Sequence, residues 1–241
     1  MDRRYLRLGN FTYTDFVQGH RRTSVTQEEL LEIIDFAIAH INGDCLLYLA
    51  GNDIHFNRIL YRKLHGIGTI RGLKMPYYCE DSIKFLESYI NSPSPKKCIC
   101  LEGSNWPQTV IPSLKKVVFL PSCRSLSVDR TNLTFDFPFF KEIINKWKAG
   151  SFDWLQNGIF HAQFPYDQET LASELGSAEK IETNRDNSTM YRLKHPSMSK
   201  DSLVIDFYTS KVYNQKGRSR RVTIGEPKTF CNIYQVDGFR I

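Results

Sequence analysis

Few residues of this sequence stand at the spacings that enzymes use. The six histidines are scattered, and none belongs to a His-Glu-x-x-His or His-x-Glu pattern. Ser-x-x-Lys recurs along the chain without the motifs that accompany it in serine enzymes, and a lone Gly-x-Gly at 66–68 makes neither a Walker loop nor a dinucleotide fingerprint. A catalytic group assembled from distant residues would be recognised only by geometry. We therefore expect no catalytic residues, metal or cofactor, and interpret the chain as not an enzyme.

The cysteines also lack a metal-binding or redox pattern. There is no Cys-x-x-Cys pair and no Cys/His cluster at zinc-finger spacing, which favours reduced thiols in an intracellular protein. The first residues are polar, and no apolar run approaches the roughly 20 residues of a membrane span. We expect a cytoplasmic or nuclear protein that has no contact with a membrane.

One basic cluster is a candidate contact site. Within 211–221 there are five basic residues and no acidic residue, and the chain as a whole has a net charge of +6. The cluster suits phosphates or an acidic partner, which makes a nucleic-acid-associated protein the alternative function. The other interpretation, which we favour, is a solvated hairpin loop, because no aromatic residues interleave the arginines. The candidate basic contacts are Lys211, Lys216, Arg218, Arg220 and Arg221.

The second set of candidates consists of exposed strand positions. They alternate with apolar residues in short strand-like runs, are mixed in charge and are rich in hydrogen-bonding groups, which suits protein recognition. They are equally compatible with ordinary solvated strand faces. Trp106 is either a loop anchor packed on the next helix or an exposed binding residue. The candidates are Tyr48, Lys74, Cys100 and Ser127, with Asn52, Tyr77, Glu102 and Arg130 nearby, and Trp106.

These positions follow from a repeat in the sequence. Leu47-x-Leu49, Leu73-x-Met75, Ile99-x-Leu101 and Leu126-x-Val128 have their second anchors 26, 26 and 27 residues apart. Asparagines follow several of the anchors, as in the leucine-rich template with its period of about 20–29 residues. The pattern predicts strands near 46–49, 70–75, 98–101 and 125–128. A strand near 5–8, anchored at Leu8, would begin a longer first repeat of about 41 residues.

Helical patterns separate the predicted strands. Apolar residues recur at spacings of three and four residues, which predicts amphipathic helices that bury one side. The strongest helix begins with the capping box Thr26-Gln27-Glu28-Glu29 and buries Leu30, Ile34, Ala37 and Ile41. A composition of 41% hydrophobic and 24% charged residues in 241 residues is typical of a globular protein with a sizeable core.

The rhythm changes near residue 158. A strand at 159–164 and a helix at 168–175 are followed by a polar loop at 176–187, and alternating strands continue to 234. We predict two regions: 1–157 with leucine-rich-like β-α repeats, and 158–241 with the last repeat and a β-rich cap. The fold class is α/β, a leucine-rich-repeat-like β-α solenoid with a small C-terminal antiparallel β cap.

Several segments together resemble a known family. They are Leu101-Glu-Gly-Ser-Asn-Trp-Pro107, Phe119-Leu-Pro-Ser122, Leu126-Ser-Val128 through Asn132-Leu-Thr134, and Phe140, Ile143 and Trp147-Lys-Ala-Gly150. They are similar to the nematode F-box-associated, leucine-rich-like domains over about 45–165 of the chain, and the strands at 191–213 are similar to the closing strands of that group.

The resemblance implies a target-recognition module of a Skp–cullin–F-box ubiquitin ligase, with a Skp-type adaptor and a cullin as partners and no catalytic residues. This sequence departs from that pattern, because residues 1–40 contain one amphipathic helix where an F-box requires three. We therefore expect a non-catalytic protein-binding domain of unknown target, apparently without its F-box.

Overall fold

The structure is a computed structural model that describes residues 8–14, 26–50, 54–65, 67, 70–93, 97–150, 159–181, 188–196, 201–209 and 229–237. Its chain forms two compact units. The first unit comprises Met1–Ser125 and Arg130–Asn132, and the second comprises Leu126–Asp129 and Leu133–Ile241. The division falls within one strand, β5 (Cys123–Thr131), and not near residue 158, where the sequence pattern changes.

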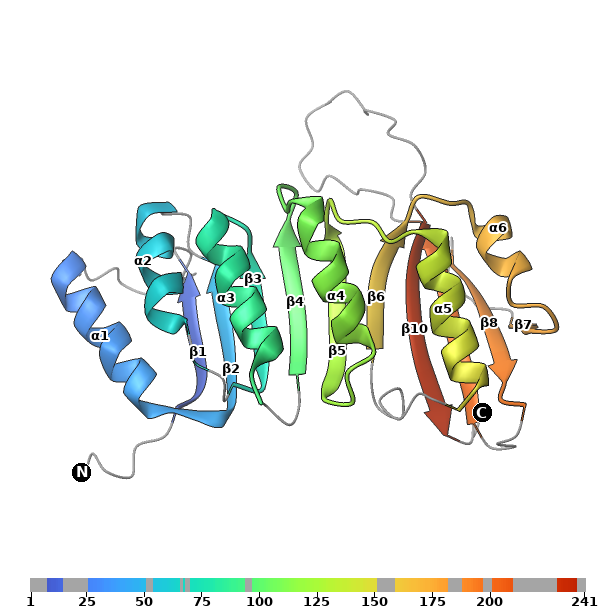
Figure 1. Cartoon of the computed structure of the whole chain (residues 1–241), viewed down its shortest axis with the longest axis horizontal. Helices are drawn as coiled ribbons and strands as arrows, with labels where there is room; N and C mark the ends of the chain where they lie inside the picture. The colour runs from blue at the N-terminus through green and yellow to red at the C-terminus, as the bar shows by residue number, and fades with distance from the viewer. Residues whose placement is uncertain are drawn as a thin grey trace, which may run out of the picture. The chain divides into compact units, whose positions relative to one another are not determined.

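The first unit alternates strands and helices in chain order. The four strands β1 to β4 are neighbours in that order and pair in parallel. The helices follow one another along one side of these strands (Figure 1). The elements are β1 (Leu8–Thr14), α1 (Gln27–His40), β2 (Ile41–Ala50), α2 (Ile54–Leu64), β3 (Gly72–Pro76), α3 (Glu80–Asn91), β4 (Lys97–Gly103), the 3-10 helix η2 (Gln108–Val110) and α4 (Ile111–Val118).

The sequence anchors form the core of this unit. Leu47, Leu49, Leu73, Met75, Ile99 and Leu101 are all buried, as the repeat predicts. Because successive side chains of a strand point to opposite faces, the intervening residues occupy the other face, and those described are half-buried or exposed. The sheet therefore packs one face against the helices. Its other face, which we call the open face, carries the candidate residues.

Local signals place the first helix where the sequence predicts it. Thr26 Oγ1 accepts from the Glu29 amide at 3.2 Å, and Glu29 Oε2 accepts from the Thr26 amide at 2.8 Å, which completes the capping box. Ile34 and Ala37 are buried on the inner side of α1. Ile41 begins β2, so the predicted helix face ends one residue earlier.

The register predicted for the first strand was wrong. The strand β1 spans Leu8–Thr14, and its residue opposite Leu49 is Tyr13, not Leu8. Leu8 lies opposite Ile41 instead, at the start of β2, and the register shifts between Leu8 and Asn10. The apolar pair Leu6-x-Leu8 imitates an anchor, but Phe11 and Tyr13 occupy the anchor positions. Residues 5–7 lie outside the described residues.

The second unit is mainly antiparallel. Its strand order is β6-β10-β9-β8-β7, and every neighbouring pair is antiparallel, which confirms the predicted antiparallel sheet. The predicted loop at 176–187 was wrong over Glu179–Ile181, which forms β7. The elements are α5 (Phe137–Lys148), β6 (Ile159–Phe164), α6 (Gln168–Ser173), β7 (Glu179–Ile181), β8 (Ser188–Lys194), β9 (Asp201–Thr209) and β10 (Thr229–Asp237). The predicted strands at 211–213 and 221–224 lie outside the described residues.

Aromatic packing forms the core of the second unit. Phe135 stacks on Phe139 with ring centroids 5.0 Å apart, and Phe160 meets Phe135 edge-on at 5.3 Å. Phe140 meets Phe164 edge-on at 5.4 Å. Such geometries add stabilisation beyond the apolar area that they bury. The chain is thus a mixed α/β protein, mostly parallel in its first half and antiparallel toward its C-terminus. None of the described helices has the length and apolar character that crossing a membrane requires.

Candidate partner-binding face

The register of the first unit brings three of the candidate residues into one row. Tyr48 on β2 lies opposite Lys74 on β3, and Lys74 lies opposite Cys100 on β4. All three are half-buried on the open face. The Nζ of Lys74 lies 4.4 Å from the centroid of the Tyr48 ring, a cation–π distance that fixes the aromatic ring and the cation together.

Glu102 extends this row toward the next strand. Its Oε1 lies 3.0 Å from Nζ of Lys74 and 3.4 Å from Nη1 of Arg130, so one carboxylate bridges two cations. The series Tyr48–Lys74–Glu102–Arg130, which we call the charged row, crosses three strands of the open face and reaches β5. The sequence indicates that Glu102 lies near the site. The two ion-pair distances add that its carboxylate joins Lys74 to Arg130.

The electrostatics of the row keep Lys74 charged. Burial alone would lower the pKa of Lys74, but the hydrogen bond and charge of Glu102, with smaller effects of Tyr48 and Cys100, outweigh burial and raise the pKa above its ordinary value. Because two cations share one carboxylate, the charged row has an excess of one positive charge. That excess is available to a carboxylate of a partner.

A shallow groove of about 230 Å³ lies beside the charged row. Leu46, 47% exposed, lies over Gly72, and a Cβ on Gly72 would stand only 2.5 Å from Leu46 Cδ2. Glycine is therefore what allows the leucine side chain to lie flat across β3. Cys98, Cys100 and Ser125 complete the groove, whose lining is mainly apolar. Burial raises the pKa of the Cys98 thiol, which leaves it protonated and unreactive at neutral pH.

Trp106 is an anchor and not an exposed binding residue. Only 1% of it is exposed, its Nε1 donates to the Glu102 carbonyl at 2.9 Å, and its ring lies 5.4 Å from that of Tyr77. Asn132 Nδ2 donates to the Trp106 carbonyl at 2.8 Å. Of the two alternatives for Trp106, the loop anchor is therefore correct. Its hydrogen bond to the Glu102 carbonyl fixes the backbone at Glu102, which carries the central carboxylate of the charged row.

For the remaining candidates the structure shows no place in this site. Ser127 is half-buried and belongs to the part of β5 that lies in the second unit. Asn52 and the whole basic cluster, Lys211, Lys216, Arg218, Arg220 and Arg221, lie outside the described residues. The candidates that the structure does bring together are Tyr48, Lys74, Cys100, Glu102 and Arg130.

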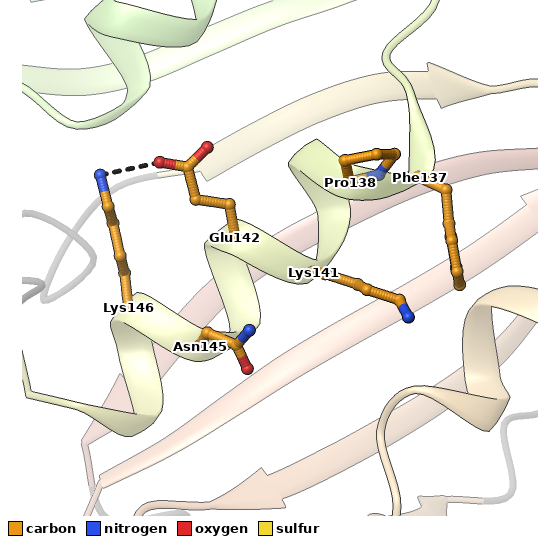
Figure 2. A pocket seen from close by; sticks show the side chains of 6 residues that line it. All are labelled: Phe137, Pro138, Lys141, Glu142, Asn145 and Lys146. Carbon is orange, nitrogen blue, oxygen red and sulfur yellow. Dashed lines mark ion pairs between the residues drawn. The ribbon is translucent and has the colours of Figure 1, made fainter.

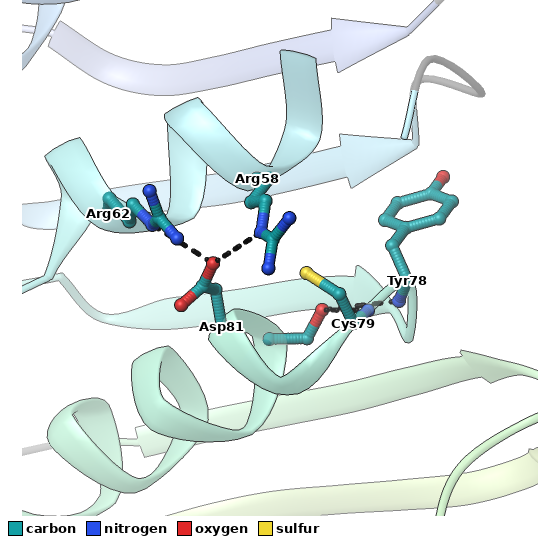
Figure 3. Close-up of polar contacts among 6 residues, drawn as sticks. Arg58, Arg62, Tyr78, Cys79 and Asp81 are labelled. Carbon is teal, nitrogen blue, oxygen red and sulfur yellow. Dashed lines mark hydrogen bonds and ion pairs between the residues drawn. The ribbon is translucent and has the colours of Figure 1, made fainter. Parts of the chain in front are cut away.

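A second polar cluster joins α2 to α3 (Figure 3). Asp81 Oδ2 accepts from Nε of Arg58 at 3.2 Å and from Nε of Arg62 at 3.0 Å. Beside it, the Ser82 hydroxyl accepts from the amides of Tyr78 and Cys79 at the start of α3. Burial would raise the pKa of Asp81, but the two arginines and Lys84 outweigh it and lower the pKa. Every contact is between elements of the chain itself, so we interpret this cluster as structural.

A depression of about 440 Å³ follows one side of α5 in the second unit (Figure 2). Lys146 and Glu142 form an ion pair of 3.0 Å one turn apart, and Nζ of Lys141 lies 4.7 Å from the centroid of the Phe137 ring. The labelled side chains spread along the helix and do not converge on one point (Figure 2). In the described part of the chain, no group of three or more His, Cys, Asp or Glu residues could hold a metal ion.

Comparisons of the chain with protein-family models, curated proteins and solved structures find no significant match.

Proposed function

We propose that this chain is a non-catalytic protein-binding domain and that its target docks on the open face of the first unit. The observation that carries the proposal is the charged row, Tyr48–Lys74–Glu102–Arg130, which borders an apolar groove on the sheet face opposite the helices. An aromatic ring and an arginine beside an apolar recess are the residue types that contribute most at protein interfaces.

The charge distribution favours a protein target over a nucleic acid. Phosphate-binding surfaces gather cations without intervening acids, whereas here Glu102 lies between Lys74 and Arg130. A protein segment complementary to the open face would have an apolar side chain to fill the groove at Leu46 and a carboxylate to pair with Lys74 and Arg130. Lys74 is already held by Tyr48 and Glu102, so little side-chain entropy is lost when such a segment binds.

The finer assignment of fold and pathway belongs to the same proposal. We assign the chain to a leucine-rich-like β-α solenoid with a small C-terminal antiparallel β cap, in accord with strands that follow chain order and helices on one side of the first unit. With the resemblance to F-box-associated domains, this makes the chain a target-recognition module in a Skp–cullin–F-box ubiquitin ligase context, with the open face holding the target.

Affinity purification of the tagged full chain from its native cells, followed by mass spectrometry, tests the proposal. We compare the wild type with Lys74→Glu, which breaks the ion pair to Glu102 and places two carboxylates side by side. The matched control is Lys116→Glu, which makes the same change of charge at an exposed position of α4 on the helix side.

We expect proteins that are recovered with the wild type and with Lys116→Glu to be depleted at least about tenfold with Lys74→Glu. Recovery that is equal for the three chains would overturn the placement of the site. Recovery of a Skp-type adaptor and a cullin supports the ligase context, and specific partners without them refute it. Recovery of nucleic acid alone, with a steep loss as salt rises, would support the 211–221 cluster instead.

A further inference from the structure

The helix α1 carries a second apolar face that remains exposed among the described residues of its unit. Ile34 and Ala37 pack inward, yet Ile33 is 50% exposed and Phe36 is 41% exposed. Glu29, Ile33, Phe36 and His40 are spaced by four, three and four residues, so they lie along one line of the helix. We call these four residues the outer stripe.

The outer stripe lies at the end of the row of helices. Asp35 faces α2, because its two carboxylate oxygens accept from Nζ of Lys63 at 2.6 and 2.8 Å. Around the axis of α1, Asp35 lies at least a quarter turn away from Ile33 and Phe36. The outer stripe therefore lies on the side of α1 away from α2, and α1 is the outermost helix of the first unit (Figure 1). Single exposed apolar residues are ordinary, but two large ones on adjacent turns form a contiguous patch.

The patch is ordered and strongly acidic at its edges. The ring of Phe36 lies 4.2 Å from that of His40, and His40 Nδ1 lies 2.6 Å from the Phe36 carbonyl oxygen, so the aromatic pair is held in place. Glu28, Glu29 and Glu32 are exposed around it, and the sequence of α1 contains no lysine or arginine. Asp35 pairs with Lys63, whereas the carboxylates of Glu28, Glu29 and Glu32 form no ion pair with another described residue.

We propose that the outer stripe binds a basic amphipathic helix of a partner protein. The contact between α1 and α2 is an example of this kind of pairing within the chain. The helix α2 is itself basic and amphipathic: it buries Phe56 and Leu60, and its Lys63 pairs with Asp35 of α1. A partner helix with an apolar stripe flanked by lysines or arginines matches Ile33 and Phe36 in its centre and Glu29 and Glu32 at its edge.

The same charges argue against a symmetric pairing with a second copy of the chain. A two-fold contact through the outer stripe would bring together two copies of α1, a helix whose charged residues are acidic and which contains no lysine or arginine, and an excess of like charge across an interface is destabilising. The occupant is therefore a different, basic surface. This second site is independent of the open face and is tested separately from it.

The test uses the full chain and a designed peptide of about 18 residues, long enough to form a helix on binding, with a leucine stripe flanked by lysines. A second peptide has glutamates in place of the lysines. Fluorescence anisotropy gives the dissociation constant of each. We expect the lysine peptide to bind the wild type at least about tenfold more tightly than the glutamate peptide, and the difference to shrink as salt rises.

Matched variants place the binding on the outer stripe. Ile33→Ala with Phe36→Ala should weaken the lysine peptide at least about tenfold, whereas Ile54→Ala, which truncates another exposed apolar residue, should not. Glu32→Lys should weaken it severalfold, and Glu87→Lys on α3 and Lys74→Glu on the open face should leave it within about twofold. Except for Lys74, the substituted side chains are exposed, so the urea midpoints of the variants other than Lys74→Glu should stay close to that of the wild type.

Failure of the lysine peptide to bind, equal binding of the two peptides, or binding that survives loss of Ile33 and Phe36 would each overturn the proposal. Self-association of the wild type that sedimentation shows to be lost in Phe36→Ala would also overturn it, because a second copy would then be the occupant. None of these results bears on the open face.

Discussion

At the scale of single residues, Lys97 shows how a motif-like spacing acquires a structural meaning. In the sequence it completes one of several Ser-x-x-Lys patterns, which we treat as chance matches. In the structure it is buried, and its Nζ donates to the carbonyls of Tyr89, Ile90 and Ser92 at 2.9, 2.5 and 2.6 Å. These carbonyls belong to the end of α3 and to its C-cap residue Ser92, where the regular hydrogen bonds of the helix stop. Lys97 therefore caps the C-terminal end of α3.

Replacing Lys97 with methionine should lower the free energy of unfolding by about 2–3 kcal/mol. The methionine side chain is nearly as long as that of lysine, but the three carbonyls lose their charged donor. Urea unfolding followed by circular dichroism measures the change. Lys116→Met, at an exposed position in the last turn of α4, is the control and should cost no more than about 0.5 kcal/mol. A cost below about 1 kcal/mol for Lys97→Met would contradict the capping role.

At the scale of the elements, Gly72 and Leu46 determine how β2 and β3 present the groove. A Cβ at position 72 would collide with Cδ2 of Leu46, and the backbone of β4 lies 3.7 Å away at the Cys98 carbonyl. We expect Gly72→Ala to lower the free energy of unfolding by about 1 kcal/mol through this crowding. In a Leu46→Ala background the same substitution should cost less than half as much. A double-mutant cycle in urea measures the coupling, and strictly additive costs would refute the contact.

The contact between α2 and α3 gives a prediction that depends on pH. Asp81→Asn should lower the free energy of unfolding by about 0.5–1 kcal/mol at pH 7, because Arg58 and Arg62 are mostly exposed and solvent screens their ion pairs. Glu80→Gln, in the same first turn of α3, separates the effect of the helix dipole from that of the arginines.

The direction of the pH dependence follows from the pKa of Asp81. Its folded-state pKa is lowered below the usual 3.8, so its stabilising effect is complete well above that value and disappears as the pH falls through the folded-state pKa. The difference in urea midpoint between the wild type and Asp81→Asn should therefore be constant from pH 7 to about pH 5 and vanish at more acidic pH. A difference that grows on acidification would contradict the assignment of the ion pairs.

At the scale of the whole molecule, local and periodic features could be predicted from the sequence, whereas pairings across long stretches could not. The anchors Leu49, Met75 and Leu101 are buried because a repeat of constant length places them on one sheet face. The capping box at Thr26 needs only neighbours in the chain. By contrast, β10 pairs with β6 and β9, and no spacing in the sequence indicates that the last strand lies between them.

For the candidate site too, the sequence predicts the features that depend on the repeat and not those that depend on contacts between repeats. Alternation along the strands predicts that Tyr48, Lys74 and Cys100 lie on the open face, and the equal spacing of the repeats places them in register. Whether Trp106 is exposed depends on Tyr77 and Asn132, which approach it from other repeats, so the sequence left two alternatives. The first strand was misplaced because an apolar pair at 6 and 8 imitates an anchor, whereas Phe11 and Tyr13 are the residues in register.

The central claim is that a target protein docks on the open face of the first unit. Photo-crosslinking tests it most directly: a photoreactive phenylalanine derivative replaces Tyr48 on the open face in one chain and Glu87 on the helix side in another, and both are irradiated in native cells. We expect a discrete crosslinked protein from position 48 that is absent from position 87. Crosslinks from position 87 alone, or the same products from both positions, would contradict the account.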